Sequence, residues 1–181
     1  MVKELDPEGV ARRKHRLDRR RGEYITPGPN YLWSIDAHCK LEKWGFQIYA
    51  GIDAYSRCIV WLHCSVTARS GASVVKQYLR AVNTLGAQPE ILRSDHGSET
   101  YIIADYHFQI AQLVREDYYN KDTGEPIAGE DISFAHAFIF GTSVANQRIE
   151  CWWGEMTRGA LQRWRVSLPR PIYKDRLIEV L

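Results

Sequence analysis

Residues 31–37 read Tyr-Leu-Trp-Ser-Ile-Asp-Ala, an aromatic and aliphatic run that carries one carboxylate, Asp36. Such runs are typical of buried strands, and two more follow at 46–53 and 58–66. The connections between them, including residues 54–57, are short enough for hairpins. The sequence therefore predicts an antiparallel three-stranded meander at the start of the folded domain.

Beyond residue 70 the apolar residues follow helical spacing. The spacing over 74–82 predicts a helix that Gly86 ends. The apolar run Ile91-Leu92 then predicts a strand that returns beside the first, because a helix between two strands forms a parallel crossover. Residues 101–114 again show a helical apolar face, and we expect a second helix there.

The last third of the chain predicts one more strand and one more long helix. A polar stretch at 115–131 is expected to be an exposed loop, and 132–140 is expected to be the fifth strand. Gly141-Thr142-Ser143 offers a turn and an N-cap for the helix that follows. The residues of this helix predicted to face the core are Ile149, Trp152, Trp153, Met156, Ala160 and Trp164.

These elements predict an α/β fold with a five-stranded mixed sheet, three antiparallel strands followed by two parallel ones, flanked by helices. We expect the core domain to span 30–168, after a basic arm at 1–29 and before a helical extension at 169–181. At 181 residues and 45% hydrophobic content, one domain is the expectation.

The chain shows no sign of a membrane or secretory protein. It has no run approaching the roughly 20 apolar residues of a membrane span, and no apolar signal-peptide core. We therefore expect a soluble intracellular protein. The four cysteines form no CxxC pair and sit in apolar runs, so buried free thiols are expected rather than disulfides or a zinc site.

Positive charge is concentrated in one short segment. Residues 11–21 carry seven Arg or Lys against one acid, whereas the rest of the chain has 17 bases and 21 acids. This arm predicts contact with nucleic acid phosphates, or a nuclear-import signal and hence nuclear localisation; the alternative is a solvated linker. The candidate phosphate-binding residues there are Arg12, Arg13, Arg19, Arg20 and Arg21.

Three acidic residues lie in or beside apolar segments, where an unpaired charge is unfavourable. Asp36 lies in the first strand, Asp95 ends the run 90–95, and Glu150 lies at the rim of the apolar face of the last helix. A carboxylate beside an apolar strand is costly to desolvate unless it is paired or binds a cation. Three of them predict a site for Mg²⁺ or Mn²⁺. A fourth acid, Asp53, is expected to cap a turn instead.

Four strings of sequence together resemble a known family. They are WSIDAHCKL around Asp36, GIDAYSRCIVWL around Asp53, RSDHGSE around Asp95 and GTSVANQRIECWW around Glu150. In this order they resemble the ribonuclease-H-like catalytic core of retroviral integrases and DDE transposases, in particular integrase-core-like proteins of eukaryotic genomes related to mobile elements. The resemblance covers roughly residues 30 to 165.

The resemblance implies a polynucleotidyl transferase that acts on DNA and holds two metal ions when substrate is bound. Asp36 would bridge both ions, while Asp95 and Glu150 would each hold one. A homodimer is also implied. Because 54 residues separate Asp95 from Glu150, more than in retroviral integrases, Glu155 is the alternative third ligand.

Each of the other polar residues near the three acids has a functional and a structural interpretation. His38 and His96 stand close to predicted ligands and would touch the scissile phosphate or a metal; otherwise they are strand-end histidines. Asn146, Gln147 and Arg148 precede Glu150 and would meet DNA phosphates; otherwise they are solvated helix residues.

Two further functions are compatible with the same residues. One is a host-adopted DNA- or protein-binding module that keeps the fold without turnover. The other is a hydrolase of RNA in RNA–DNA hybrids, because the same fold and carboxylates serve that reaction.

Overall fold

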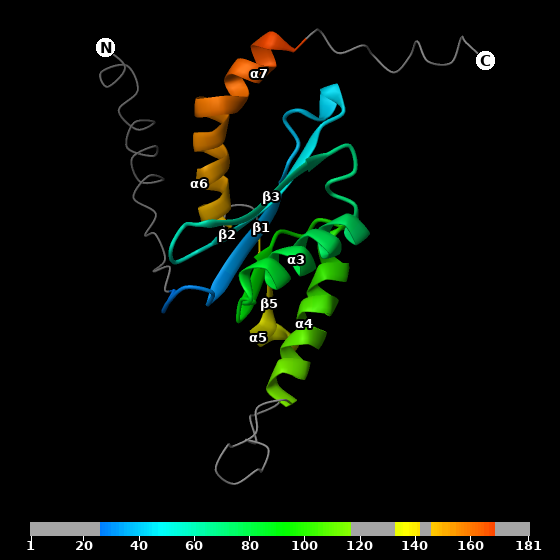
Figure 1. Ribbon diagram of the computed structural model, residues 1–181, viewed down its shortest axis with the longest axis vertical. Helices are drawn as coiled ribbons and strands as arrows, with labels where there is room; N and C mark the ends of the chain where they lie inside the picture. Colours follow the sequence, from blue (N-terminus) through cyan, green and yellow to red (C-terminus); the bar gives the residue numbers. More distant parts are fainter. Residues whose placement is uncertain (1–25, 117–132, 142–145, 169–181) are drawn as a thin grey trace, which may run out of the picture.

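The structure is a computed structural model that describes residues 26–116, 133–141 and 146–168. The predicted basic arm, most of the predicted polar loop, the Thr142-Ser143 cap and the C-terminal extension lie outside the described residues. The elements in chain order (Figure 1) are β1 (Leu32–His38), η1 (Glu42–Trp44), β2 (Gln47–Asp53), β3 (Ile59–Ser65), α3 (Gly71–Leu85), β4 (Ile91–Ser94), α4 (Thr100–Glu116), α5 (Phe134–Ala137), β5 (Phe138–Phe140), α6 (Gln147–Met156), η3 (Thr157–Leu161) and α7 (Gln162–Ser167).

The five strands form one mixed sheet in the order β3-β2-β1-β4-β5. β1 pairs antiparallel with β2, which pairs antiparallel with β3. On the other side β1 pairs parallel with β4, and β4 pairs parallel with β5. The predicted sheet is therefore confirmed, with β1 at its centre (Figure 1).

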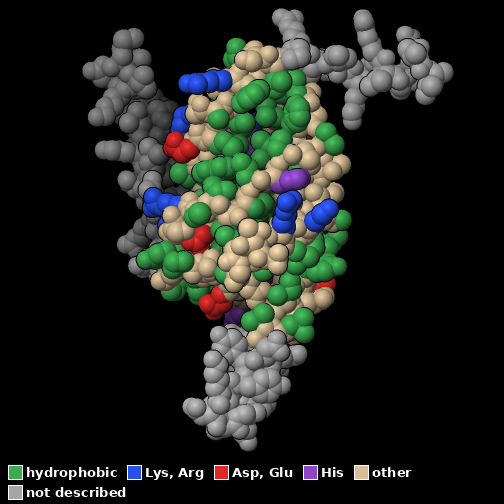
Figure 2. Space-filling model, viewed as in Figure 1, with side chains coloured by type: hydrophobic (Ala, Val, Ile, Leu, Met, Phe, Trp, Pro, Cys, Tyr) green, Lys and Arg blue, Asp and Glu red, His purple; other side chains and the backbone are tan. Residues whose placement is uncertain are grey.

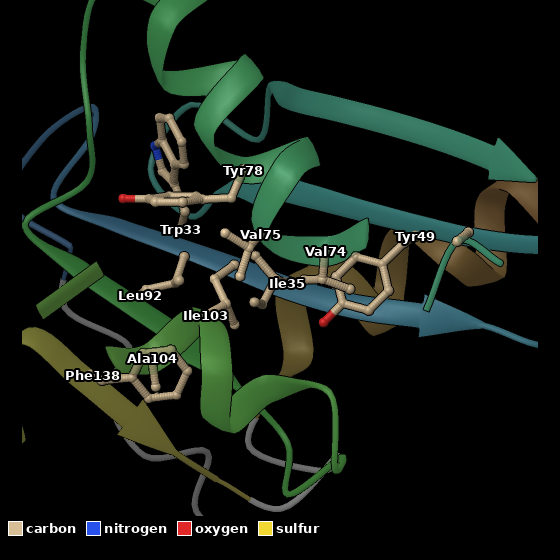
Figure 3. Close-up of a cluster of buried hydrophobic side chains, with 11 residues drawn as sticks. Trp33, Ile35, Tyr49, Val74, Val75, Tyr78, Leu92, Ile103, Ala104 and Phe138 are labelled. Atoms are coloured by element: carbon tan, nitrogen blue, oxygen red, sulfur yellow. The ribbon is translucent and has the colours of Figure 1, made fainter. Parts of the chain in front are cut away.

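Helices cover both faces of the sheet, and the alternation of strand residues shows how. Along β2, Tyr49 packs into one apolar cluster while its neighbours Ile48 and Ala50 pack into another. The first cluster lies between the sheet and helices α3 and α4 (Figure 3). Its buried members are Trp33, Ile35, Tyr49, Ala68, Val74, Val75, Tyr78, Leu92, Ile103, Ala104 and Phe138. The second cluster lies under α6 and contains Ile149 and Trp153.

Helix α3 begins and ends where the sequence predicts. The side chain of Ser70 accepts a hydrogen bond from the backbone N–H of Ser73, at 3.3 Å, as an N-cap. Gly86 ends the helix with φ of 64°, a left-handed conformation that favours glycine. The Ser70 cap and Gly86 therefore define both ends of the helix that connects β3 to β4.

The fifth strand is shorter than predicted. Within the predicted range 132–140 the structure has one turn of helix, α5, and a strand of only three residues. β4 is itself only four residues long and pairs with β5 at three positions, from Leu92 with Phe138 to Ser94 with Phe140. The residues before Phe138 have no strand to pair with, so they close a helical turn instead.

The last helix departs from its predicted face after Met156. Ile149 and Trp153 are buried and Trp152 and Met156 pack against the second cluster, as predicted. Ala160 and Trp164 are exposed, so the prediction is wrong for both. Residues Thr157–Leu161 form a π-helical turn, whose wider turn rotates the apolar face.

The cysteines are free, as predicted, but they are not buried. Cys39 is half-buried, and Cys58, Cys64 and Cys151 are exposed. β3 is an edge strand, so apolar sequence around Cys64 does not bring burial. In the part of the chain that the structure describes, no helix has the length and apolar character to cross a membrane.

Candidate active site

Asp36 lies in the central strand with its side chain under α6. Ile35 points into the first apolar cluster, and Asp36, the next residue of β1, therefore points to the opposite face. There the indole N–H of Trp153 donates a hydrogen bond to Oδ2 of Asp36 at 2.9 Å. A carboxylate in the middle of the sheet therefore accepts a hydrogen bond from α6.

Two polar contacts hold α6 and the turn after it against β1. The amide Nδ2 of Asn146, at the N-terminus of α6, donates to the backbone carbonyl of Ile35 at 2.9 Å. Beyond the C-terminal end of α6, Thr157 Oγ1 lies 3.2 Å from Nε2 of His38. Glu150, in the first turn of α6, is consequently placed beside the end of β1 and remains exposed.

Asp36 and Glu150 open into the same pocket. The pocket has a volume of about 370 Å³. Its lining residues are Asp36, Ala37, His38, Cys39, Lys40, Glu150 and Trp153. Two of the three predicted metal ligands therefore share one solvent-accessible space, although 113 residues separate them in the chain.

Asp95 comes to the same end of the sheet. It follows β4, which runs parallel to β1, and the carboxyl ends of parallel neighbours meet at one edge. Oδ1 of Asp95 accepts a hydrogen bond from the backbone N–H of Gly97 at 3.0 Å. The Asp95 side chain does not line the pocket that Asp36 and Glu150 share.

The three carboxylates affect one another electrostatically. The pKa of Asp36 is raised from 3.8 to about 7, mainly by burial and to a smaller extent by the negative charges of Asp95 and Glu150, while the hydrogen bond from Trp153 opposes the shift. All three acids are therefore close enough for their charges to interact. The ion pairs of Arg69 and Arg158 involve other acids, Glu42, Glu99 and Glu155.

Comparison with known proteins decides the family. The integrase core domain matches residues 23–120, more than half of the chain. The chain belongs to the integrase core domain family. No curated protein matches it. The sheet order and the flanking helices are those of a ribonuclease-H-like integrase core.

The family match covers only two of the three acids. Asp36 and Asp95 lie within the matched residues of the integrase core domain, whereas Glu150 lies after them. The assignment of Glu150 therefore depends on the structure. Its position on the shared pocket and its effect on the pKa of Asp36 favour it over Glu155, which is exposed and pairs with Arg158.

The donor chemistry of this integrase core suits a hard cation. Integrase cores generally use divalent metals, and carboxylate oxygens are the ligands that Mg²⁺ and Mn²⁺ prefer. The pKa of Asp36 is raised mainly by burial and less by the charges of Asp95 and Glu150, and a cation bound to the carboxylate would favour its ionised form. Among the described residues, however, no three His, Cys, Asp or Glu side chains are arranged so that they could hold a metal ion. One oxygen of Asp36 instead accepts from Trp153.

The predicted nucleic-acid contacts have different environments. Asn146 is 1% exposed and its amide is bonded to Ile35, so its burial argues against the predicted DNA contact. Gln147 is exposed and Arg148 is half-buried on the first turn of α6. His96 is exposed and its ring stacks on Phe140 with centroids 5.4 Å apart. The five arginines of the arm lie outside the described residues.

His38 lines the pocket but is only 4% exposed. Burial lowers its pKa below 6.5, and the positive charge of Lys40 adds to the effect. The ring stacks against Trp153 with centroids 4.9 Å apart. The ring of His38 therefore contacts both Trp153 and Thr157.

Asp53 caps a turn, as predicted. Its Oδ1 accepts from the backbone N–H of Asn30 at 2.9 Å, and its Oδ2 accepts from the backbone N–H and the hydroxyl of Ser56. With 2% exposure and three hydrogen bonds, this carboxylate has a structural role on the far end of the sheet from Asp36.

Trp153 is the site residue that sequence analysis did not identify. The apolar spacing of the helix predicted only a core position for it. Its position three residues after Glu150 places both on one side of α6, and the indole N–H needs an acceptor when buried. These two facts together point to the Asp36 carboxylate, but only after the helix has been docked on β1.

We expect Trp153→Phe to raise the pKa of Asp36 by about one to two units, since a hydrogen bond to a charged group contributes about 1.5 to 3 kcal/mol. The phenyl ring keeps the apolar contact and removes only the donor to Oδ2. The carboxyl carbon of Asp36 can be titrated by ¹³C NMR. Trp152→Phe, which changes the adjacent indole, is the control and should leave the titration in place. Equal shifts in both variants would contradict the role of this hydrogen bond.

Proposed function

We propose that this integrase core is a divalent-metal-dependent polynucleotidyl transferase or nuclease that acts on DNA phosphodiesters. Asp36, Asp95 and Glu150 are the proposed ligands for Mg²⁺ or Mn²⁺. The observation that supports the proposal is the geometry: Asp36 and Glu150 line one open pocket, and Asp95 follows β4, the parallel neighbour of β1, at the same end of the sheet. Like charges held together in this way favour a bound cation.

The roles of the residues follow from their positions. Divalent ions, when bound to such carboxylates, stabilise the negative charge that develops on the oxygens of a phosphodiester. Asp36 on the rigid central strand supplies the fixed ligand, and Glu150 supplies an exposed carboxylate across the pocket. Asn146 and His38 act through α6 and keep Glu150 beside β1.

A second function is favoured by one observation. Asp36 is bonded to Trp153, and the described His, Cys, Asp and Glu residues form no ready metal-binding group of three. A DNA-binding module without turnover has no need for such a group. The homodimer and the nuclear localisation remain predictions, since they depend on the resemblance and on the arm.

Glu150→Gln should reduce Mn²⁺-dependent nicking of supercoiled plasmid DNA by at least about 100-fold. Groups that merely support metal ligands already contribute roughly 10- to 100-fold, and Glu150 is proposed as a ligand itself. The matched control is Glu155→Gln, which removes a carboxylate of the same helix that pairs with Arg158. This exposed pair contributes little, so the control should nick at the rate of the parent within about twofold.

The same assay separates the three functions. Nicking of plasmid and linear DNA supports the transferase, whereas preferential cleavage of an RNA–DNA hybrid of the same sequence supports the hydrolase. Metal-independent DNA binding by the parent protein, with no cleavage of any substrate, would leave only the binding module. A larger loss in Glu155→Gln than in Glu150→Gln would transfer the third ligand to Glu155.

A further inference from the structure

Arg69, between β3 and α3, contacts two separate segments at the end of the sheet where the acids lie. Its Nη1 donates to the Sγ of Cys39 at 3.3 Å, three residues after Asp36 in the chain. Its Nε lies 4.0 Å from Oε1 of Glu99, in the turn between Asp95 and α4. Cys39 lines the pocket, whereas Asp95 does not. One guanidinium therefore connects the pocket to the turn that carries the second proposed ligand.

The backbone around Arg69 is held on both sides, so the side chain extends from a fixed point. The preceding residue, Ala68, is fully buried, and its carbonyl oxygen accepts a hydrogen bond from Nε2 of Gln77 at 2.7 Å. The following residue, Ser70, is the N-cap of α3. The backbone N–H of Arg69 donates to Oε1 of Gln47, at the start of β2, at 3.3 Å. These contacts fasten the segment before α3 to both the helix and the sheet.

Glu99 is a buried acid that depends on a positive partner. It is 8% exposed, and a buried carboxylate is unfavourable unless it is paired or hydrogen-bonded. Arg69 supplies the charge, with 39% of its own side chain exposed. Loss of one partner of a buried pair leaves an uncompensated charge and is strongly destabilising. Nη1 of Arg69 also lies 3.8 Å from Oε1 of Glu42, but that acid is 48% exposed and the pair contributes little.

The carboxylate of Glu99 packs on the backbone of the turn that carries Asp95. A Cβ atom at Gly97 would lie 2.9 Å from the carboxyl carbon of Glu99, so this side chain sits directly against Gly97. The backbone N–H of Gly97 donates to Oδ1 of Asp95 at 3.0 Å. The hydroxyl of Thr100 donates to the carbonyl oxygen of Gly97 at 2.6 Å, at the start of α4. The position of Glu99 therefore affects the orientation of the Asp95 carboxylate.

We propose that Arg69 is a positioning residue of the metal site. Through Cys39 and Glu99 it joins the end of β1 to the turn of Asp95, and so sets the separation between Asp36 and Asp95. This inference rests on the proposed function, because it assigns how two ligands of that site are held together. A positive charge beside a cation site by itself weakens cation binding, so a favourable effect of Arg69 has to come from geometry. The two effects have opposite signs and can be separated by experiment.

The first measurement is Mn²⁺ binding by the full chain, followed by isothermal titration calorimetry. Arg69→Gln should weaken Mn²⁺ binding by about 10- to 100-fold, the range for residues that orient metal ligands. A purely electrostatic role of Arg69 predicts tighter binding instead, because the substitution removes a positive charge, and that result would overturn the proposal.

The double variant Arg69→Gln/Glu99→Gln tests whether Arg69 acts through Glu99. A neutral glutamine can remain buried against Gly97 without a partner of opposite charge, so the double variant should recover at least about threefold of the affinity lost in Arg69→Gln. Removal of a second acid would lower Mn²⁺ affinity if charge alone mattered. A loss in the double variant that equals or exceeds the loss in Arg69→Gln would contradict the role of Glu99.

The second measurement requires neither metal nor turnover. Hydrogen exchange of the Gly97 amide, followed by NMR in EDTA, reports on the hydrogen bond from Gly97 to Asp95. Arg69→Gln should increase this exchange rate by about tenfold and leave the amides of β1 unchanged. A uniform increase that includes β1 would show general destabilisation and would count against a positioning role.

Arg80→Gln is the matched control, because it removes the same charge from an exposed position on α3. Basic and acidic side chains, in blue and red, are interspersed over the face shown in Figure 2, so the surface there has no continuous patch of one sign. Exposed charges are also screened by salt. The control should change Mn²⁺ affinity by less than about twofold and leave Gly97 exchange unchanged. Effects equal to those of Arg69→Gln would refute the specific role of Arg69.

The two measurements separate this inference from the proposed function. If the parent protein binds no Mn²⁺, the proposed function fails, whereas faster exchange of Gly97 alone in Arg69→Gln still supports the connection from Arg69 to the Asp95 turn. If the parent binds Mn²⁺ and Arg69→Gln changes neither the affinity nor the exchange of Gly97, the positioning role fails and the proposed function stands.

Discussion

Asp36→Asn should make the metal-free protein more stable at pH 8 and remove its response to Mn²⁺. In the folded protein burial and two neighbouring acids raise the pKa of Asp36 from 3.8 to about 7. An ionised Asp36 is therefore disfavoured by the fold, by up to roughly 4 kcal/mol at 1.36 kcal/mol per pKa unit. Asparagine has nearly the same shape, can accept the Trp153 hydrogen bond and carries no charge.

The sign of the pH dependence follows from proton binding. Because the folded pKa lies above the unfolded value, the folded protein holds more protons between about pH 4 and pH 7. The contribution of Asp36 to stability is complete below about pH 4 and is lost as the pH rises through 7. The variant should lack this loss, so its advantage over the parent should grow across this interval.

Mn²⁺ should reduce the stability advantage of Asp36→Asn over the parent. A cation that binds only the ionised carboxylates stabilises the parent, by about 2.7 kcal/mol when its concentration is 100 times the dissociation constant. Thermal melting with and without Mn²⁺ at pH 5 and pH 8 measures both effects. Flat, identical metal responses of parent and Asp36→Asn would count against the metal site and the function proposed from it.

Asp53→Asn is the matched control for this experiment. Asp53 accepts three hydrogen bonds from Asn30 and Ser56, and an amide would point a donor at one of these donors. The same chemical change should therefore destabilise the protein by about 1 to 3 kcal/mol. A gain in stability at both positions would show that a general charge effect, and not the environment of Asp36, is responsible.

Trp33→Ala should lower the free energy of unfolding by about 3 to 5 kcal/mol. Trp33 is fully buried in the central strand, its ring centroid lies 6.2 Å from that of Trp61 and 6.4 Å from that of Tyr78, and its indole N–H donates to Asn30 at 3.0 Å. Figure 3 shows it beside Tyr78 in the first apolar cluster. Against a typical total of about 5 to 15 kcal/mol, the loss is a large part of the stability of the domain.

Trp164→Ala is the matched control, and urea denaturation measures both variants. Trp164 is 61% exposed on α7, so the same truncation should change the free energy of unfolding by no more than about 0.5 kcal/mol. If the two losses were similar, Trp164 would pack as its helical spacing predicted.

The contrast between these two tryptophans shows where sequence patterns are sufficient. A period of two along β1 and β2 assigns each residue to a face, and the short connections leave one antiparallel arrangement. Trp33 is buried for that reason. The face of Trp164 depends on the π-helical turn at Thr157–Leu161, and the 3.6-residue period used for the prediction does not hold through such a turn.

For this protein the sequence alone determined the order of the sheet, the family, and the presence of Asp36 and Asp95 at the carboxyl ends of adjacent parallel strands. These follow from local spacing and from connection rules. Only the tertiary structure decided that Glu150 and not Glu155 lies beside Asp36, that Asn146 fastens α6 and that Trp153 bonds the carboxylate. Such contacts join residues more than 100 positions apart, and they depend on how α6 docks on β1, which no local pattern specifies.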